Sequence, residues 1–173
     1  MEVRGKTALV TGGAHRVGRA ITLALAAAGA NVVVNYHSSA EAAQETAAMV
    51  RALGVEALPL QADVSRAGEV EAMVAAAEER LGAVGILVNA ASLWLKTPFP
   101  LADYVGWQRV TGILIDGAMY CANAVAPGML RAGEGAIVNI VDLSAWQPWP
   151  GYAAHAVGKA ALLALTRQLA LEL

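Results

Sequence analysis

Short apolar segments alternate with longer amphipathic segments along the chain. The short segments are rich in β-branched residues and nearly free of polar ones, as is typical of parallel strands that are buried on both faces. The longer segments repeat apolar positions at helical spacing, and several of them end at a glycine. The expected strands are residues 7–12, 31–36, 57–63, 86–91 and 136–142, and the expected helices are 16–29, 38–54, 65–82, 103–129 and 152–173.

This alternation determines the expected fold class. Parallel strands that are joined through helices need right-handed crossovers, which place helices on both faces of the sheet. The pattern therefore predicts an α/β fold with a doubly wound, Rossmann-type, mostly parallel sheet. We find no internal repeat, linker or low-complexity segment, so we expect a single domain over residues 1–173.

Composition narrows the functional classes. With 57% hydrophobic and 15% charged residues, the 173-residue chain is too apolar to be disordered. Its formal net charge of -2 gives no basic surface for nucleic acid or an anionic membrane, so a small-molecule substrate is expected. The single cysteine, Cys121, cannot form an internal disulfide, and we expect it to be a small core residue. Because no secretory signal precedes the first strand, we also expect a cytoplasmic protein. No apolar run reaches the roughly 18 residues of a membrane span, and we expect no metal site.

A glycine-rich turn, TGGAHRVG at residues 11–18, joins the first expected strand to the first helix. Such a turn lets the backbone approach a phosphate at a helix N-terminus, although it can also merely connect two elements. Its spacing differs from G-x-G-x-x-G and resembles the TGxxxGxG turn of the short-chain dehydrogenase/reductase family. Thr11, Gly12 and Gly18 match this turn, and Arg16 stands at the middle glycine. The surrounding AHRVGRAI resembles the pteridine reductase branch of the family.

The resemblance implies a nicotinamide dinucleotide at the strand ends. Asp63, in QADVS, matches the aspartate that accepts a hydrogen bond from adenine, and an ordinary helix cap is the alternative. Asn89, in VNAAS, matches the first asparagine of the family's NNAG motif, which steadies the central strands, whereas Ala90 replaces the second. The predicted cofactor-binding residues are Thr11, Gly12, Arg16, Val17, Gly18, His37, Ser38, Ser39, Asp63, Asn89 and Lys159.

The end of the second strand bears on the choice of cofactor. The stretch NYHSS carries no acid that would bond a ribose 2′-hydroxyl, and it offers His37, Ser38 and Ser39 near Arg16 instead. We therefore expect NADP rather than NAD. A capping box between Ser38 and Glu41 is an alternative role for the serine, and the resembling reductases usually carry arginine at its position.

The family's Tyr-x-x-x-Lys pair aligns with the last expected helix, where Lys159 matches the lysine and His155 replaces the tyrosine. In the family, the lysine binds the nicotinamide ribose and the residue one turn earlier protonates the substrate. Histidine can donate a proton near neutral pH, and a histidine bonded to a backbone carbonyl is the alternative. Asp142 matches an aspartate of pteridine reductases that orients or shares the proton. The predicted catalytic residues are Asp142, His155 and Lys159.

Aromatic residues surround the same predicted site. Trp94 matches an aromatic residue that stacks a pterin ring, and packing within its loop is the alternative. Tyr152 lies three residues before His155 and is a candidate for a substitute hydroxyl. Trp146 and Trp149 flank the site, either as pocket lining or as packing. The predicted substrate-binding residues are Ser92, Trp94 and Tyr152.

Two functions stay open. The first is NADPH-dependent reduction of a pterin or a similar flat carbonyl or imine substrate by hydride transfer. The second is a catalytically impaired dinucleotide-binding homologue or a fragment of a reductase. Three departures from the family pattern favour it, namely Ala90, His155 and Leu114. Leu114 stands where many family members have an asparagine that holds a relay water. Family members typically continue past residue 173 with further strands and a substrate lid. We expect an exposed sheet edge there, and a homo-oligomer, either a dimer or a tetramer.

Overall fold

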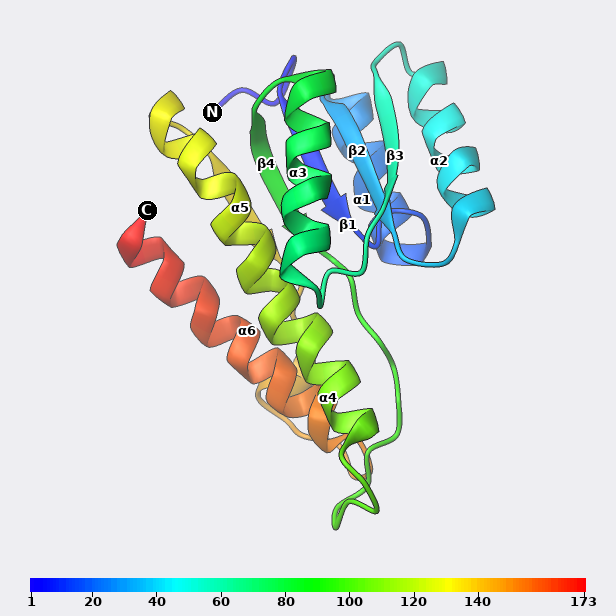
Figure 1. Ribbon diagram of the computed structural model, residues 1–173, viewed down its shortest axis with the longest axis vertical. Coiled ribbons are helices and arrows are strands. Elements are labelled where there is room, and N and C mark those ends of the chain that lie inside the picture. The colour runs from blue at the N-terminus through cyan, green and yellow to red at the C-terminus, as the bar shows by residue number, and fades with distance from the viewer.

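The computed structural model describes residues 1–173 as one parallel sheet with helices on both faces (Figure 1). The strands run in the order β3-β2-β1-β4-β5, and every neighbouring pair is parallel. This arrangement confirms the doubly wound fold. The strands are β1 (Thr7–Thr11), β2 (Asn31–Tyr36), β3 (Ala57–Gln61), β4 (Val84–Asn89) and β5 (Ala136–Asn139). The helices on the two faces are α1 (Arg16–Ala27), α2 (Ala40–Ala52), α3 (Ala67–Leu81), α5 (Gly117–Ala132) and α6 (Ala153–Glu172).

Two apolar clusters hold the layers together. Leu9 and Val10 of β1 belong to opposite clusters because successive side chains of a strand point to opposite faces. The cluster around Leu9 joins the sheet to α3 and α5, and the cluster around Val10 joins it to α1 and α2. Cys121 of α5 is fully buried in the first cluster, and this burial raises the pKa of its thiol to about 12. The prediction that Cys121 is a core residue is confirmed.

The strand order reverses at β1, which lies between β2 and β4. In doubly wound sheets, ligands bind beyond the carboxyl ends of the strands at such a reversal. The glycine turn follows β1, and the two alanines after Asn89 follow β4 at the same edge of the sheet. The fold therefore places the predicted cofactor residues where the architecture favours a binding site.

Four of the five strands end earlier than the sequence predicts, and two of them, β4 and β5, do so beside the candidate site. After Asn89, the backbone N–H groups of Ala90 and Ala91 each donate to the hydroxyl of Thr11 at 3.0 Å instead of joining a neighbouring strand. After β5, which ends at Asn139, the carboxylate of Asp142 accepts the N–H of Ser144 and begins a short 3-10 turn, η2 (Leu143–Ala145). Both chain segments leave the sheet at the edge that carries the candidate site.

The helix predicted over residues 103–129 consists of three parts. These parts are α4 (Val105–Thr111), a π-helical segment η1 (Gly112–Asp116) and α5. Leu114 in η1 is 1% exposed and packs against α6, where a Cβ on Gly158 would lie 3.0 Å from the Cβ of Leu114. A glycine at position 158 therefore allows the two helices to approach, and the leucine fills the space between them.

The combined helix Val105–Ala132 is long and apolar enough to pass a test for membrane spans, with a mean hydropathy of 1.3. In its most apolar window, 44% of the residues are buried within the fold, and α5 packs against α3 and β4. One helix of this kind is a weak indication of a membrane span, because a helix packed in a protein core passes the same test.

Candidate active site

The glycine turn between β1 and α1 has a backbone path that side chains would obstruct. Gly12 has a φ of +62°, and a Cβ there would lie 3.0 Å from the Cα of Ala91. A Cβ on Gly18 would lie 2.9 Å from the carbonyl carbon of Gly12 and closer still to its oxygen. Arg16 adopts a φ of 45°, in the left-handed region that favours glycine. This conformation agrees with the glycine that the family turn has at this position.

The N-terminus of α1 is open to an anion. His15 makes no side-chain capping bond, and the first turn of the helix carries no acid. The first N–H groups and the positive end of the helix dipole are therefore free to bind a phosphate. The side chains of Arg16 and Val17 are exposed beside them. The close backbone path and the free helix terminus fit the pyrophosphate of a nicotinamide dinucleotide.

Two buried polar side chains brace this turn. Asn35 of β2 is 2% exposed and accepts a hydrogen bond from the N–H of Gly12 at 3.2 Å. Asn35 was not predicted as a site residue, although it is a polar residue within the mostly apolar segment NVVVNY. Thr11 is 1% exposed, and its hydroxyl is occupied by the backbone of β4 and the residues after it. Thr11 therefore shapes the turn, and its side chain is not free to contact a ligand.

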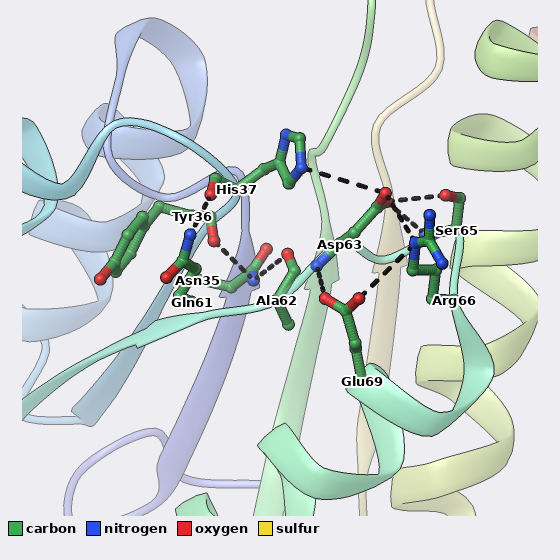
Figure 2. A network of polar contacts seen from close by, with 9 residues as sticks. All are labelled: Asn35, Tyr36, His37, Gln61, Ala62, Asp63, Ser65, Arg66 and Glu69. Carbon is green, nitrogen blue, oxygen red and sulfur yellow. Dashed lines mark hydrogen bonds and ion pairs between the residues drawn. The ribbon is translucent and has the colours of Figure 1, made fainter.

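Asp63 lies beyond β3 at the centre of a polar network that Figure 2 shows. One carboxylate oxygen accepts bonds from the N–H and hydroxyl of Ser65 at 3.0 and 2.7 Å. The other lies 4.0 Å from Nε2 of His37 and 3.6 Å from Nε of Arg66. Partial burial opposes ionisation, but the bonds from Ser65 and the nearby bases lower the pKa of Asp63 below its usual value.

Neither alternative role at these strand ends is formed. Arg66, rather than Asp63, is the N-cap of α3, and it makes no side-chain capping bond. Ser39 is the N-cap of α2 and also makes no such bond, while Ser38 is exposed. The capping box between Ser38 and Glu41 is therefore wrong. The hydroxyls of Ser38 and Ser39 stay free beside the exposed His37.

His155 lies in the first turn of α6 and is 2% exposed. Its Nε2 is 2.8 Å from Oδ2 of Asp142. The other oxygen of Asp142 accepts bonds from the N–H and the hydroxyl of Ser144 at 2.9 and 2.5 Å. The imidazole is thus paired with a carboxylate, and the alternative of a histidine bonded to a backbone carbonyl is wrong. Nδ1 of His155 is buried without a hydrogen-bond partner.

The charges around this pair favour ionised Asp142. Partial burial opposes ionisation, but the hydrogen bonds from Ser144 and His155 outweigh it and lower the pKa of Asp142. Lys159, one helical turn after His155, is 5% exposed and donates from Nζ to the carbonyl of Ile140 at 2.5 Å. Burial lowers the pKa of Lys159, and the charge of Asp142 partly offsets this effect. A carboxylate, an imidazole and an ammonium thus come together beyond β5.

Aromatic rings cover this group on one side. Trp94 stacks on Tyr152 with ring centroids 4.4 Å apart, and its ring meets His155 edge-on at 4.6 Å and Trp149 at 5.6 Å. Trp94 is nevertheless 53% exposed, so it packs within the cluster and still presents an aromatic surface. Ser92 is exposed in the same loop, and Trp146, 59% exposed, lies outside these ring contacts.

Asn89 joins strands beneath the site. Its amide donates to the side-chain oxygen of Asn139 at 2.8 Å, and Asn139 in turn donates to the hydroxyl of Thr166 at 2.9 Å. This chain of polar side chains connects β4, β5 and α6. The side-chain oxygen of Asn89 is buried without a partner. Asn89 thus braces the strands, and its predicted role toward the cofactor stays a prediction.

Comparison with known proteins agrees with this geometry. The family description "short chain dehydrogenase" matches residues 6–173. The chain is 35% identical over 168 residues to a 3-oxoacyl-[acyl-carrier-protein] reductase of Synechocystis sp., covering 97% of the chain and 68% of the relative. It is 36% identical over 172 residues to 3beta-hydroxysteroid dehydrogenase 1 of Eggerthella lenta, covering 99% and 66%.

A solved structure shows the same architecture. The crystal structure of NAD+-bound xylitol dehydrogenase superposes with a TM-score of 0.93 at 30% identity, covering 99% of this chain and 66% of that one. The chain thus spans about two thirds of the length of these relatives. The family match, the identities and the shared fold agree with the glycine turn and the lysine of α6. The chain therefore belongs to the short-chain dehydrogenase/reductase family and is an oxidoreductase by lineage.

Proposed function

We propose that the protein is an NADPH-dependent reductase of a flat carbonyl or imine substrate such as a pterin. The observation that carries the proposal is the Asp142–His155 pair with Lys159, beyond β5 at the edge of the sheet that holds the glycine turn. When bound, the nicotinamide supplies the hydride of the reaction. The glycine turn and the N-terminus of α1 would hold the pyrophosphate of the dinucleotide, and Lys159 would hold its nicotinamide ribose.

The chain's own contribution is a proton. The Asp142 side chain is 36% exposed and that of His155 only 3%, so the carboxylate is the member of the pair that faces a substrate. The imidazole donates from Nε2 to Oδ2 of Asp142 and holds the proton there. Because Asp142 is ionised, the proton starts on Nε2 of His155, crosses the 2.8 Å bond to the exposed carboxylate and passes from it to the substrate oxygen or nitrogen. The carboxylate is then ionised again, and the pair regains a proton from water. Ser144 fixes the carboxylate in this orientation.

The proposed preference for NADPH makes a direct prediction about Arg16. The Arg16→Gly variant should lose about tenfold in NADPH affinity, because a charged contact to the 2′-phosphate disappears, while NADH affinity stays near that of the wild type. Glycine is the suitable replacement because it adopts the φ of 45° without strain. Calorimetry with both cofactors measures the effect. Equal wild-type affinities for NADPH and NADH would contradict the preference.

The substrate class is tested by turnover. Oxidation of NADPH should be measured with pterins, quinones, steroid ketones, 3-oxoacyl thioesters and small ketones. The exposed face of Trp94 beside Tyr152 supports a preference for flat rings over small ketones. The relatives named above are described as acting on other substrates, so turnover with 3-oxoacyl thioesters alone would contradict the pterin proposal.

A second candidate is a homologue with impaired catalysis. Two observations favour it: Leu114 is buried where the family resemblance places a water-holding asparagine, and Nδ1 of His155 has no hydrogen-bond partner. Such a protein would bind NADPH and oxidise it with none of the substrates above. The same assay, preceded by a binding measurement, therefore separates the two candidates.

We also propose a homo-oligomer, a cytoplasmic location and one domain over residues 1–173. Apolar side chains on α5 and α6 support an oligomer, because Met119, Leu130 and Val157 are 43%, 59% and 47% exposed. Sedimentation at several concentrations tests this part, and a monomer at every concentration would contradict it.

A further inference from the structure

The first turn of α6 is capped from a distant part of the chain. Its N-cap residue, Tyr152, makes no side-chain capping bond. The N–H of Ala154 donates instead to the hydroxyl oxygen of Thr97 at 3.0 Å, across 57 positions of sequence. Threonine is a favoured capping residue because its oxygen satisfies one of the free N–H groups of the first turn. Thr97 is 3% exposed, so water does not easily replace this bond.

The backbone of Thr97 adds two further bonds to the same helix start. Its N–H donates to the carbonyl of Gly151 at 2.8 Å, and its carbonyl accepts from the N–H of Ala153 at 3.3 Å. Thr97 therefore pairs with Tyr152 as an isolated parallel bridge. On its other side, Thr97 faces α4, where a Cβ added to Gly106 would be in contact with the Thr97 methyl group at 3.4 Å. Thr97 is fixed on both sides.

This attachment connects two parts of the candidate site. Trp94 lies in the same loop as Thr97, and its ring stacks on Tyr152 and contacts His155. His155 lies directly after Ala154, the residue whose N–H is capped. We infer that Thr97 is a positioning residue, whose hydroxyl fixes the first turn of α6 and the Trp94 loop in one arrangement. Its effect on turnover rests on the proposed function, whereas its effect on the helix does not.

The test uses two variants of Thr97 and one matched control. The Thr97→Val variant removes the hydroxyl and keeps the shape, and Thr97→Ser keeps the hydroxyl and removes the methyl group. The control is Thr7→Val, because Thr7 is also 3% exposed and donates from its hydroxyl to the carbonyl of Leu81 at 2.6 Å. Thr7 begins β1, at the end of the sheet opposite the site. It therefore controls for the loss of a buried hydroxyl.

Hydrogen exchange and near-ultraviolet circular dichroism measure the positioning without any reaction. In Thr97→Val, the amide of Ala154 should exchange about tenfold faster and the dichroism of the Trp94 cluster should weaken, because the cap is lost. Thr97→Ser and Thr7→Val should leave both signals at the site near those of the wild type. With an active enzyme, Thr97→Val should lower kcat about tenfold and leave the KM for NADPH unchanged.

The outcomes separate this inference from the proposed function. Unchanged exchange at Ala154 in Thr97→Val, or equal acceleration there in Thr7→Val, would overturn the positioning role. If Thr97→Val does not fold, Thr97→Ser decides, since faster exchange in a variant that keeps the hydroxyl would also overturn it. A wild type without turnover, combined with faster exchange in Thr97→Val, would refute the proposed reductase and support the role of Thr97.

Discussion

Replacing Asp142 with asparagine should lower reductase turnover by about 10²- to 10⁴-fold, the usual contribution of a general acid. Asparagine preserves the size of the side chain and the acceptor for Ser144, so the local turn should persist. It removes the negative charge that Nε2 of His155 faces at 2.8 Å. The measurement is kcat under saturating NADPH, with calorimetry showing that the cofactor still binds.

The same proton role predicts how the reaction rate depends on pH. The reaction consumes a proton that the Asp142–His155 pair holds, so the wild-type rate should fall as pH rises and the proton is lost. Asp142 is already ionised at neutral pH because hydrogen bonds lower its pKa. In Asp142→Asn the pair loses this ionised carboxylate, so the falling limb should move from its wild-type position. A variant with wild-type kcat and an unmoved limb would contradict the proton role.

The chain contains a matched control for the loss of this charge. Asp63 accepts the same two bonds from Ser65 that Asp142 accepts from Ser144, and it also faces a histidine, His37. The Asp63→Asn variant should raise the KM for NADPH, because this turn lies at the predicted adenine end of the site. Its falling pH limb should stay in place. A shift of the limb in both variants would indicate a general charge effect rather than a proton held at Asp142.

The substitution at His155 is tested by a pair of variants. The His155→Phe variant removes the proton-holding group at position 155, and His155→Tyr restores the family's hydroxyl near Lys159 and Asp142. We expect the tyrosine variant to turn over faster than the phenylalanine variant by about 10²-fold or more. Comparison of the tyrosine variant with the wild type then shows which donor serves the reaction better. Equal rates for the two variants would remove position 155 from the chemistry.

The features that were predictable from the sequence are those with a local or periodic cause. Residues 32–34 are all valine because β2 is covered on both faces, and such runs identify the strands. Gly29, Gly54 and Gly82 follow helices and adopt φ values of +92°, +84° and +79°, which is why glycines indicated the helix ends. The fold class follows from this alternation alone. The cofactor and catalytic assignments rested on the family resemblance and stay predictions.

The features that were missed depend on contacts between distant residues. Thr97 caps a helix 57 positions away, and no pattern near it indicates this. The resemblance did place Asp142 near the proton donor, but not the turn η2 that brings its carboxylate to 2.8 Å from His155. Ser144 had a local signal, since an aspartate two residues before a serine favours such a turn. The π-helical segment around Leu114 packs closely against Gly158, which lies 44 positions later in the chain.

The Gly18→Ala variant should lower NADPH affinity by about 100-fold, because one methyl group would displace the backbone that meets the pyrophosphate. The added Cβ would lie 2.9 Å from the carbonyl carbon of Gly12 and closer to its oxygen, so this carbonyl must move. A displacement of about 1 Å can cost about 10²-fold where positioning matters, and overpacking of this kind also costs about 1–3 kcal/mol of stability.

Gly68→Ala is the matched control for this prediction. Gly68 also lies in the first turn of a helix that follows a strand, and a Cβ there would meet nothing within 4 Å. Its replacement should leave NADPH affinity unchanged and raise the free energy of unfolding by about 0.4–1 kcal/mol, because alanine restricts the unfolded chain. Calorimetric titration and urea unfolding of both variants provide the measurements. Wild-type affinity in a folded Gly18→Ala variant would show that this turn does not hold the cofactor, because the close backbone approach at Gly12 is the reason for placing the pyrophosphate there.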